Sequence, residues 1–131
     1  MKTSKNQSNQ QPAGPDVKFR TCPLWDQSVS EKARENPGLG QKIVEFQKAK
    51  TANKLAPFGS KDVPFKHGDL KGFNHTHLTH DLSLIYAMHS SNPTLIDLYG
   101  IFSHDELGTG QPINIKRQTS ISKKFRNQSF N

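Results

Sequence analysis

The sequence has one cysteine, few apolar residues and no long apolar run, and each shortage excludes a class of protein. The single thiol, Cys22, cannot form an internal disulfide or a multi-cysteine zinc site. No apolar run approaches the roughly 20 residues that cross a bilayer, and residues 1–16 lack the apolar centre of a signal peptide. We therefore expect a cytoplasmic protein without membrane partners, stabilised by packing alone.

Several catalytic motifs are also missing. The sequence contains no Gly-x-x-x-x-Gly-Lys-Ser/Thr phosphate loop, no Gly-x-Ser-x-Gly elbow and no His-Glu-x-x-His motif. Nucleotide hydrolysis and serine esterase chemistry therefore receive no support. Cys22 precedes Pro23 in an expected strand, which favours a buried, inert thiol over a nucleophile.

Positive charge, by contrast, is abundant. Lys and Arg number 18 against 11 Asp and Glu, which gives a net charge of +7. Such an excess favours polyanionic partners, either nucleic acid or an acidic protein. Residues 116–126 contain five of these cations and no acidic residue, so a solvated basic tail accounts for part of the excess.

The pattern of apolar residues predicts one α+β domain over residues 17–110. The expected elements, in order, are a strand at 17–24, a helix beginning at the capping-box pair Ser28 and Glu31, a break at 36–38, a second helix at 39–50, a loop at 53–70 and strands at 73–78, 82–88 and 94–102. The last three strands, with a turn at 90–93, should form an antiparallel meander with the helices on one sheet face. Residues 1–16, rich in Gln, Asn, Ser and Pro, should be disordered, and residues 111–131 should form a basic C-terminal tail.

Histidines gather at the predicted strands and give the clearest chemical signal. Five of the six lie in or beside these strands and their loops, namely His67, His75, His77, His80 and His104. Alternate residues of a strand share a face, so His75 and His77 should project together, roughly 7 Å apart. With Asp81 nearby, the cluster suits proton transfer, because an imidazole titrates near neutral pH.

Two other interpretations of the cluster remain open at this point. A His-x-His strand can place two nitrogens on one metal ion, with His80, His104 or Asp105 as a third ligand. Alternatively, these are partly exposed histidines without chemistry. Spacing alone does not choose among the three.

Two stretches of the sequence resemble a known family. Residues 71–86 read KGFNHTHLTHDLSLIY, and residues 95–107 read LIDLYGIFSHDEL. They resemble the YafQ branch of the RelE-type toxins of bacterial toxin–antitoxin systems, which are small ribosome-dependent mRNA endonucleases. The motif positions of that family fall on Lys71-Gly72-Phe73, His77, Asp81, Ile85-Tyr86, Ser103-His104 and Leu107. The resemblance implies a RelE/ParE-like α+β fold of one strand, two helices and three further strands.

The resemblance also implies where catalysis takes place. His77, Asp81 and His104 match active-site positions, and His67 matches a further histidine of the family. We expect metal-independent acid–base cleavage of mRNA by the histidines, with Asp81 orienting one of them and no cofactor. Lys71 and Lys66 are candidates for binding phosphate. The implied partners are mRNA on the ribosome and a cognate antitoxin protein.

This chain departs from the family pattern in two places. An arginine often found four residues before the final histidine is Gly100 here, and an aromatic residue that commonly ends the second motif is Gly108. The basic segment after Gly110 is additional to the typical member. Because of these departures, a toxin-like module that only binds RNA or protein is an alternative, and a metal-dependent enzyme using His75, His77 and His80 is another.

Overall fold

A computed structural model describes residues 17–53, 56–59, 62–89 and 94–131. The elements, in chain order, are β2 (Val17–Arg20), α1 (Pro23–Glu35), α2 (Leu39–Ala52), β3 (Val63–Pro64), the 3₁₀ turn η2 (Gly68–Leu70), β4 (Asn74–His77), β5 (Leu82–His89), β6 (Thr94–Ser103), α3 (His104–Leu107) and α4 (Ile115–Arg126). The tail expected at 1–16 and the turn expected at 90–93 lie outside the described residues. Among the residues that are described, no helix is long and apolar enough to cross a membrane.

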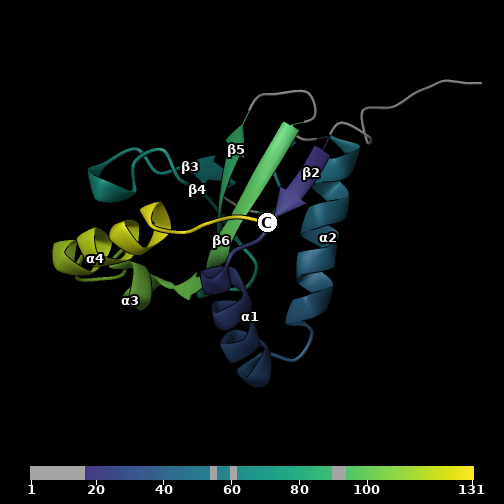
Figure 1. Ribbon diagram of the computed structural model, residues 1–131. Coiled ribbons are helices and arrows are strands. Elements are labelled where there is room, and N and C mark those ends of the chain that lie inside the picture. The colour runs from purple at the N-terminus through teal and green to yellow at the C-terminus, as the bar shows by residue number, and fades with distance from the viewer. Residues whose placement is uncertain (1–16, 54–55, 60–61, 90–93) are drawn as a thin grey trace, which may run out of the picture.

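Five strands form one sheet in the order β2-β6-β5-β4-β3, which runs through the centre of the molecule (Figure 1). β4, β5 and β6 pair antiparallel and make the expected meander. β2 pairs parallel with β6, and the two-residue strand β3 pairs antiparallel with β4 at the opposite edge. The α+β fold predicted from the sequence is confirmed, with β3 as an addition to the predicted elements.

Helices α1 and α2 cover one face of the sheet, as predicted (Figure 1). α2 turns Leu39, Ile43 and Phe46 toward the sheet, because residues three and four apart share one side of a helix. Phe46 is fully buried, and its ring centroid lies 5.2 Å from that of Tyr86 in β5. Trp25 of α1 joins the same cluster. This layer is the larger of the two apolar cores.

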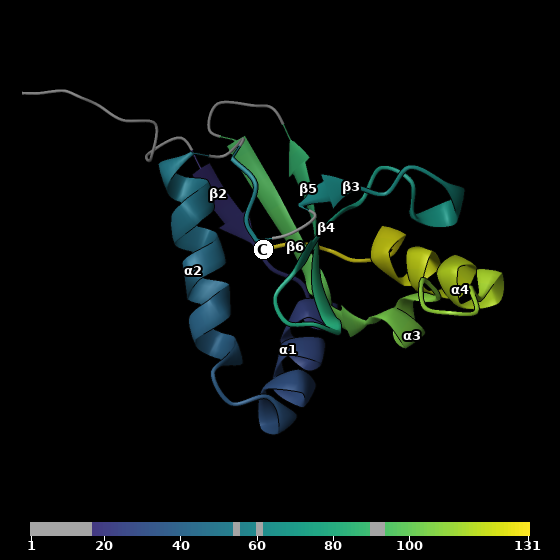
Figure 2. The ribbon, with the colours of Figure 1, turned by 180° about the vertical axis from the view of Figure 1, so that it is seen from behind.

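Helix α4 covers the opposite face of the sheet and was not predicted (Figure 2). It lies in the segment 111–131, which the sequence analysis interpreted as a basic tail. Its buried Ile121 and Phe125 pack with Ile85 and Phe102 of the sheet. Because the apolar residues of this helix are few and stand among lysines and serines, their period is too weak to predict a helix. The sheet therefore carries helices on both faces.

The last residues of the chain also pack against the domain. Asn131 and Thr21 exchange two backbone hydrogen bonds, of 2.9 and 3.2 Å. The ring of Phe130 lies 4.9 Å, centroid to centroid, from that of Tyr99. The C-terminal segment is thus fixed at both α4 and its final residues.

A β-bulge changes which residues of β6 face each core. The pairing of β5 with β6 shifts by one residue between Ile85 and Tyr86. Leu98 and Ile101, three residues apart, consequently both face the α1–α2 core, because the extra residue reverses the alternation of the strand. Tyr99 packs against the core under α4.

Helix α1 begins earlier than the sequence analysis predicted. The helix was expected to start at the pair Ser28 and Glu31, but it starts at Pro23, which shortens the preceding strand. Proline suits a first helical position, since the N–H it lacks would have no acceptor there. Ser28 lies inside the helix instead, and its buried hydroxyl donates to Trp25 O at 3.2 Å and accepts from Ile101 N at 3.1 Å. It therefore joins α1 to β6.

Candidate active site

A small pocket on the α4 side of the sheet collects three of the histidines identified in the sequence. Its volume is about 170 Å³, and β4, β5 and the segment after β6 supply its walls. The lining residues are Phe65, His75, His77, Ser83, His104, Leu107 and Thr109. Imidazoles and hydroxyls therefore converge on one space, which we call the histidine pocket.

Strand β4 supplies His75 and His77, whose side chains share a face as alternation predicts. Their ring centroids are 5.9 Å apart. Phe65 stacks on His75 at 4.1 Å with an interplanar angle of 8°, which fixes one wall of the pocket. Thr76, between the two histidines, points to the opposite face and donates a hydrogen bond to Phe58 O.

Ser83 lies on the neighbouring strand β5, directly opposite His77. The residue is 1% exposed, and its Oγ has no hydrogen-bond partner among the described residues. Most buried hydroxyls do have such a partner. The floor of the histidine pocket therefore offers a hydroxyl beside the two strand histidines.

His104 enters the pocket where β6 becomes α3. Its ring centroid lies 5.2 Å from that of His77, and the two planes are inclined by 66°. A capping box holds this junction, since Ser103 Oγ accepts from Glu106 N at 3.1 Å and Ser103 N donates to Glu106 Oε1 at 2.9 Å. His104 is therefore held at a capped helix start and not on a free loop.

The carboxylate of Glu106 also binds a lysine of α1, the helix that lies on the other face of the sheet from α4. Lys32 Nζ of α1 lies 2.7 Å from Glu106 Oε1. Burial opposes ionisation of Glu106, but the hydrogen bonds from Lys32 and Ser103 outweigh it, so the pKa of Glu106 lies below its usual value. Helix α1 thereby anchors the strand end that carries His104.

Asp81 orients the imidazole of His104. Its Oδ1 lies 3.2 Å from His104 Nδ1 and 3.4 Å from the backbone N of the same residue. An ionised carboxylate only accepts hydrogen bonds, so this contact favours a proton on Nδ1 and leaves Nε2 for a substrate. Asp81 is 63% exposed, so the pair contributes more to orientation than to binding energy. The structure thus brings His77, His104 and Asp81 together.

Lys66, His67 and Lys71 lie outside the histidine pocket as the described residues define it. All three are exposed and flank η2. This turn packs on α4, where Asp69 O accepts a hydrogen bond of 3.1 Å from Arg126. The catalytic role expected for His67 and the phosphate-binding roles expected for the two lysines stay predictions.

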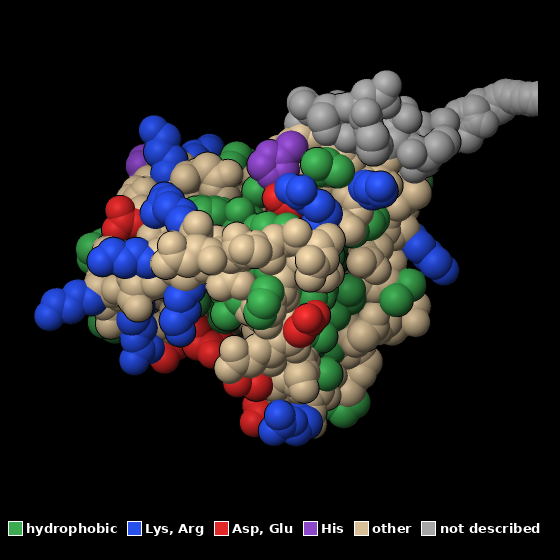
Figure 3. Space-filling model, in the orientation of Figure 1, with side chains coloured by type: hydrophobic (Ala, Val, Ile, Leu, Met, Phe, Trp, Pro, Cys, Tyr) green, Lys and Arg blue, Asp and Glu red, His purple; other side chains and the backbone are tan. Residues whose placement is uncertain are grey.

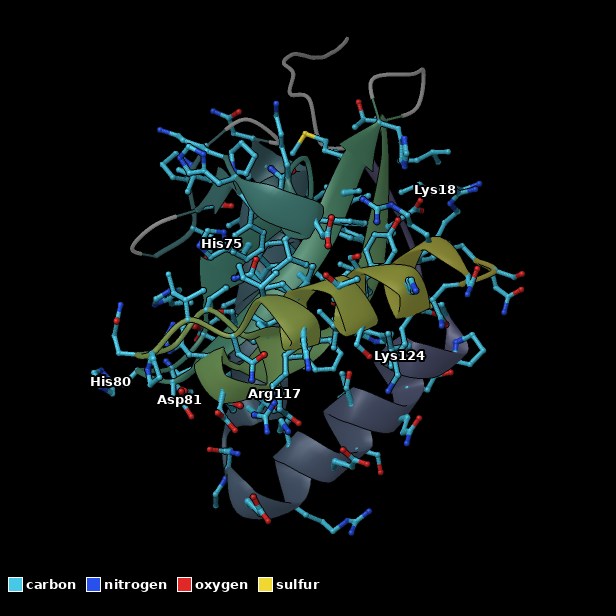
Figure 4. The ribbon with its side chains drawn as sticks, turned by 90° about the vertical axis from the view of Figure 1, so that its left-hand side faces the viewer. Lys18, His75, His80, Asp81, Arg117 and Lys124 are labelled. Carbon is cyan, nitrogen blue, oxygen red and sulfur yellow. The ribbon has the colours of Figure 1, made fainter. Side chains whose placement is uncertain are left out.

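The metal-site interpretation needed a third ligand beside the two strand histidines, from His80, His104 or Asp105. His80 is exposed in the turn between β4 and β5, and Figure 4 shows it well away from His75. Within the part of the chain that the structure describes, no three His, Cys, Asp or Glu side chains are grouped so that they could hold a metal ion. The described residues therefore give no support to the His75, His77, His80 ligand set.

Cys22 is a buried thiol, as the sequence analysis expected. It is 1% exposed, and its Sγ donates weakly to Leu98 O at 3.5 Å. Burial raises the pKa of this thiol, so it stays protonated and unreactive at neutral pH. It belongs to the α1–α2 core and not to the candidate site.

Comparison with known proteins reveals similarity at the level of structure. Neither a family model nor a curated protein matches the sequence. A YoeB/ParE toxin from Agrobacterium tumefaciens superposes with a TM-score of 0.56 at 17% identity, over 66% of this chain and 98% of its own. A histidine-to-glutamine mutant of YafQ from E. coli gives a TM-score of 0.53 at 17% identity, over 70% and 97%. YafQ in the E. coli DinJ–YafQ toxin–antitoxin complex gives 0.53 at 18% identity, over the same shares.

This chain has the fold of the RelE-type toxins. The superpositions include 98% and 97% of the first two toxins, whereas about a third of this chain has no counterpart in them. The similarity is to the RelE/ParE-like fold that the sequence resemblance implied. At identities of 17–18% this similarity establishes the fold.

Both departures from the RelE-type pattern lie where this chain has no space for a side chain. A Cβ at Gly100 would lie 2.5 Å from the ring of Phe102 and 2.8 Å from Ser28 Oγ, so the arginine of the family cannot occupy this position without a shift. Gly108 has φ of +78°, and a Cβ there would lie 2.3 Å from Asn114 O, just before α4. The approach of the α4 segment therefore explains why this second position is glycine.

Three pocket residues were not predicted from the sequence, namely Phe65, Ser83 and Thr109. The signal for Ser83 was present, because strand alternation and hairpin register place it opposite His77. Phe65 lies in the predicted loop and Thr109 follows a predicted strand end, so neither had a periodic context that could be interpreted.

Proposed function

We propose that this protein is the toxin of a toxin–antitoxin pair and that it cleaves mRNA. The observation that carries this proposal is the pair His77 and His104 on a RelE-type fold, with their ring centroids 5.2 Å apart and Asp81 hydrogen-bonded to His104. Support also comes from the net charge of +7, which suits a polyanionic substrate. The substrate we propose is mRNA on the ribosome, in the cytoplasm.

RNA carries its own nucleophile, so two proton transfers complete the cleavage. One imidazole removes the proton of the 2′-hydroxyl, and the 2′-oxygen forms a bond to the adjacent phosphorus. The bond from phosphorus to the 5′-oxygen breaks, and the other imidazole protonates that oxygen as it leaves. The products are a 2′,3′-cyclic phosphate, which water opens to a 3′-phosphate, and a 5′-hydroxyl. We assign these roles to His77 and His104 as a pair, with His67 as a further candidate.

The remaining proposed contacts concern charge. Asp81 keeps His104 in one tautomer and balances its positive charge when it is protonated. Lys66 and Lys71 are candidates for holding phosphate groups of the mRNA outside the pocket. Because the E. coli neighbour is a complex of YafQ with DinJ, we also propose that a cognate antitoxin binds this chain. An acidic or partly disordered segment covering the histidine pocket would suit its charge.

Product end groups test this chemistry directly. Protein stripped of metal is added to programmed ribosomes in a buffer that contains only the magnesium that ribosomes need. We expect cleaved mRNA with a 2′,3′-cyclic phosphate or 3′-phosphate and a 5′-hydroxyl. A metal-activated water would usually leave a 5′-phosphate and a 3′-hydroxyl instead. Such ends, with activity restored by zinc or manganese and lost in His75→Ala, contradict the proposal, and so does binding without any cleavage.

A further inference from the structure

A second hollow opens beside the histidine pocket, between α3 and the start of α4. Its volume is about 640 Å³, and residues 108 and 110–117 form most of its wall, with Asp81 and His104 at one end. His104 lines both hollows, so the second one continues the histidine pocket past the imidazole. Figure 4 shows Asp81 and Arg117 on the same side of the molecule, next to α3. We call this hollow the α4 cleft.

One cation of the α4 cleft has no carboxylate partner among the described residues. Arg117 is bound to Asp105, with 2.6 Å between Nη1 and Oδ2, and also donates to Asp105 O. Asp81 is bound to His104. Lys116 lines the cleft, is exposed, and makes no hydrogen bond or ion pair with any residue in the described ranges. Both carboxylates are thus paired, while the ammonium group of Lys116 is available to an anion.

The same cleft exposes two large apolar side chains. Ile113 is 58% exposed and Ile115 is 63% exposed, the highest values among the exposed large apolar residues of the described chain. Both line the cleft with Lys116. A nucleotide combines an apolar base and a negative phosphate, so a site for it needs apolar surface and a cation side by side. The α4 cleft provides both within a few consecutive residues.

Figure 3 shows Lys and Arg side chains over α4, on the left of the view. Five cations and no acidic residue lie in residues 116–126, so α4, which begins at the cleft, itself carries only positive charge. The histidine pocket itself is lined by no lysine or arginine of the described chain. Because Gly100 has no room for the arginine of the RelE-type pattern, a phosphate-binding cation for this site has to come from another element.

We infer that the nucleotide next to the cleaved bond binds in the α4 cleft, with its phosphate at Lys116 and its base or sugar against Ile113 and Ile115. The inference rests on the proposed function, because it treats the histidine pocket as the place of cleavage. Single-stranded RNA then passes from the histidine pocket across His104 onto the start of α4. Helix α4, which the sequence pattern did not predict, then forms part of the substrate-binding surface.

Binding of an uncleavable RNA tests the inference without depending on catalysis. The probe is a single-stranded 2′-O-methyl RNA oligonucleotide, which has no 2′-hydroxyl nucleophile, and its affinity is measured by fluorescence anisotropy over a salt series. We compare wild type, Lys116→Ala and the matched control Lys123→Ala, which removes an equal charge from an exposed position on the same helix, outside the α4 cleft. We expect Lys116→Ala to weaken binding about two- to fivefold and to lower the slope of log affinity against log salt by about 0.7. Lys123→Ala should change both quantities less.

A second pair of variants tests the apolar part of the site. Ile113→Ser should weaken binding with little change of the salt slope, because it removes apolar contact and no charge. Val44→Ser, on the exposed side of α2 and 41% exposed, is the control and should leave binding unchanged. Equal losses in Lys116→Ala and Lys123→Ala, or no binding by wild type, overturn the inference. If the wild type binds through Lys116 but leaves ribosome-bound mRNA intact, the proposed cleavage fails, whereas binding of RNA in the α4 cleft stands.

Discussion

Lys32 of α1 and Glu106 of α3 form an ion pair of 2.7 Å that joins the first helix to the strand end carrying His104. The two residues are far apart in the sequence, and Glu106 is itself part of the capping box with Ser103. Because His104 directly follows that serine, the pair acts on the position of a candidate catalytic group without touching it. Its contribution to stability should depend on pH.

Glu106→Gln should lower the free energy of unfolding at pH 7 by about 0.5–1 kcal/mol, the size of a partly exposed ion pair. Gln is compatible with a capping box, so the substitution removes the charge and keeps the backbone hydrogen bonds. The pKa of Glu106 is lowered in the folded state from 4.5, so its contribution is present above about pH 4.5 and is lost as the pH falls through the folded value.

Urea unfolding at pH 7 and at pH 2 measures this difference. Glu45→Gln, at an exposed position of α2, serves as the control and should change stability little at either pH. If the gap between wild type and Glu106→Gln is as large at pH 2 as at pH 7, the pair does not act through the charge of Glu106.

A buried ion pair fixes the segment between α2 and the sheet edge. The side chains of Lys50 and Asp62 are 3% and 1% exposed, and Tyr86 also donates to Asp62. Burial, and then the carboxylate of Asp62, raises the pKa of the Tyr86 phenol. Lys50→Met should cost about 3–5 kcal/mol, because it leaves a buried charge without its partner. Adding Asp62→Asn should cost less than the sum of the two single changes. Strict additivity in urea unfolding would refute the coupling.

Much of this fold was predictable because its signals are local and periodic. The stripe of Leu39, Ile43 and Phe46 located α2, and alternation placed His75 and His77 on one face of β4. The predicted start of α1 was wrong. Both Pro23 and the apparent capping box at Ser28 can mark the start of a helix, and the helix begins at the proline. Helix propensity could not rank these two starts, because the role of Ser28 depends on its tertiary contact with β6.

The tertiary features of the site were harder to predict. Helix α4 has too few apolar residues to show a helical period, and it is stabilised by packing on a sheet face formed far earlier in the sequence. The lack of space at Gly100 likewise depends in part on Ser28 of α1, which is far away in the sequence, and the lack of space at Gly108 depends on Asn114 just before α4. What the sequence contained was the histidine pair and its aspartate. The sequence pattern did not predict α4, whose first residues line the neighbouring α4 cleft.

Gly100→Ala tests the packing argument at the position of the missing arginine. A methyl group there would lie 2.5 Å from the ring of Phe102, so we expect a loss of about 1–3 kcal/mol in the free energy of unfolding. Gly40→Ala in α2 meets nothing within 4 Å and should be neutral or stabilising by up to about 1 kcal/mol. Thermal or urea unfolding of the two variants gives the comparison. A tolerated Gly100→Ala would mean that the ring of Phe102 moves aside at little cost.

The histidine pair itself gives the most direct prediction. Expression of the protein alone should arrest growth, and His77→Ala or His104→Ala should relieve the arrest, because each removes a proton-transfer group worth about 10²- to 10⁴-fold in rate. His80→Ala is the matched control, since His80 is an exposed histidine of the adjacent turn that does not line the histidine pocket, and it should leave the arrest in place. Circular dichroism and urea unfolding establish that each variant is folded.

Growth arrest that persists in both folded variants contradicts the catalytic assignment, whereas relief by His80→Ala would point back to the metal ligand set of His75, His77 and His80. The three histidines therefore separate the two chemistries by position, since only His77 and His104 share the histidine pocket while His80 lies outside it.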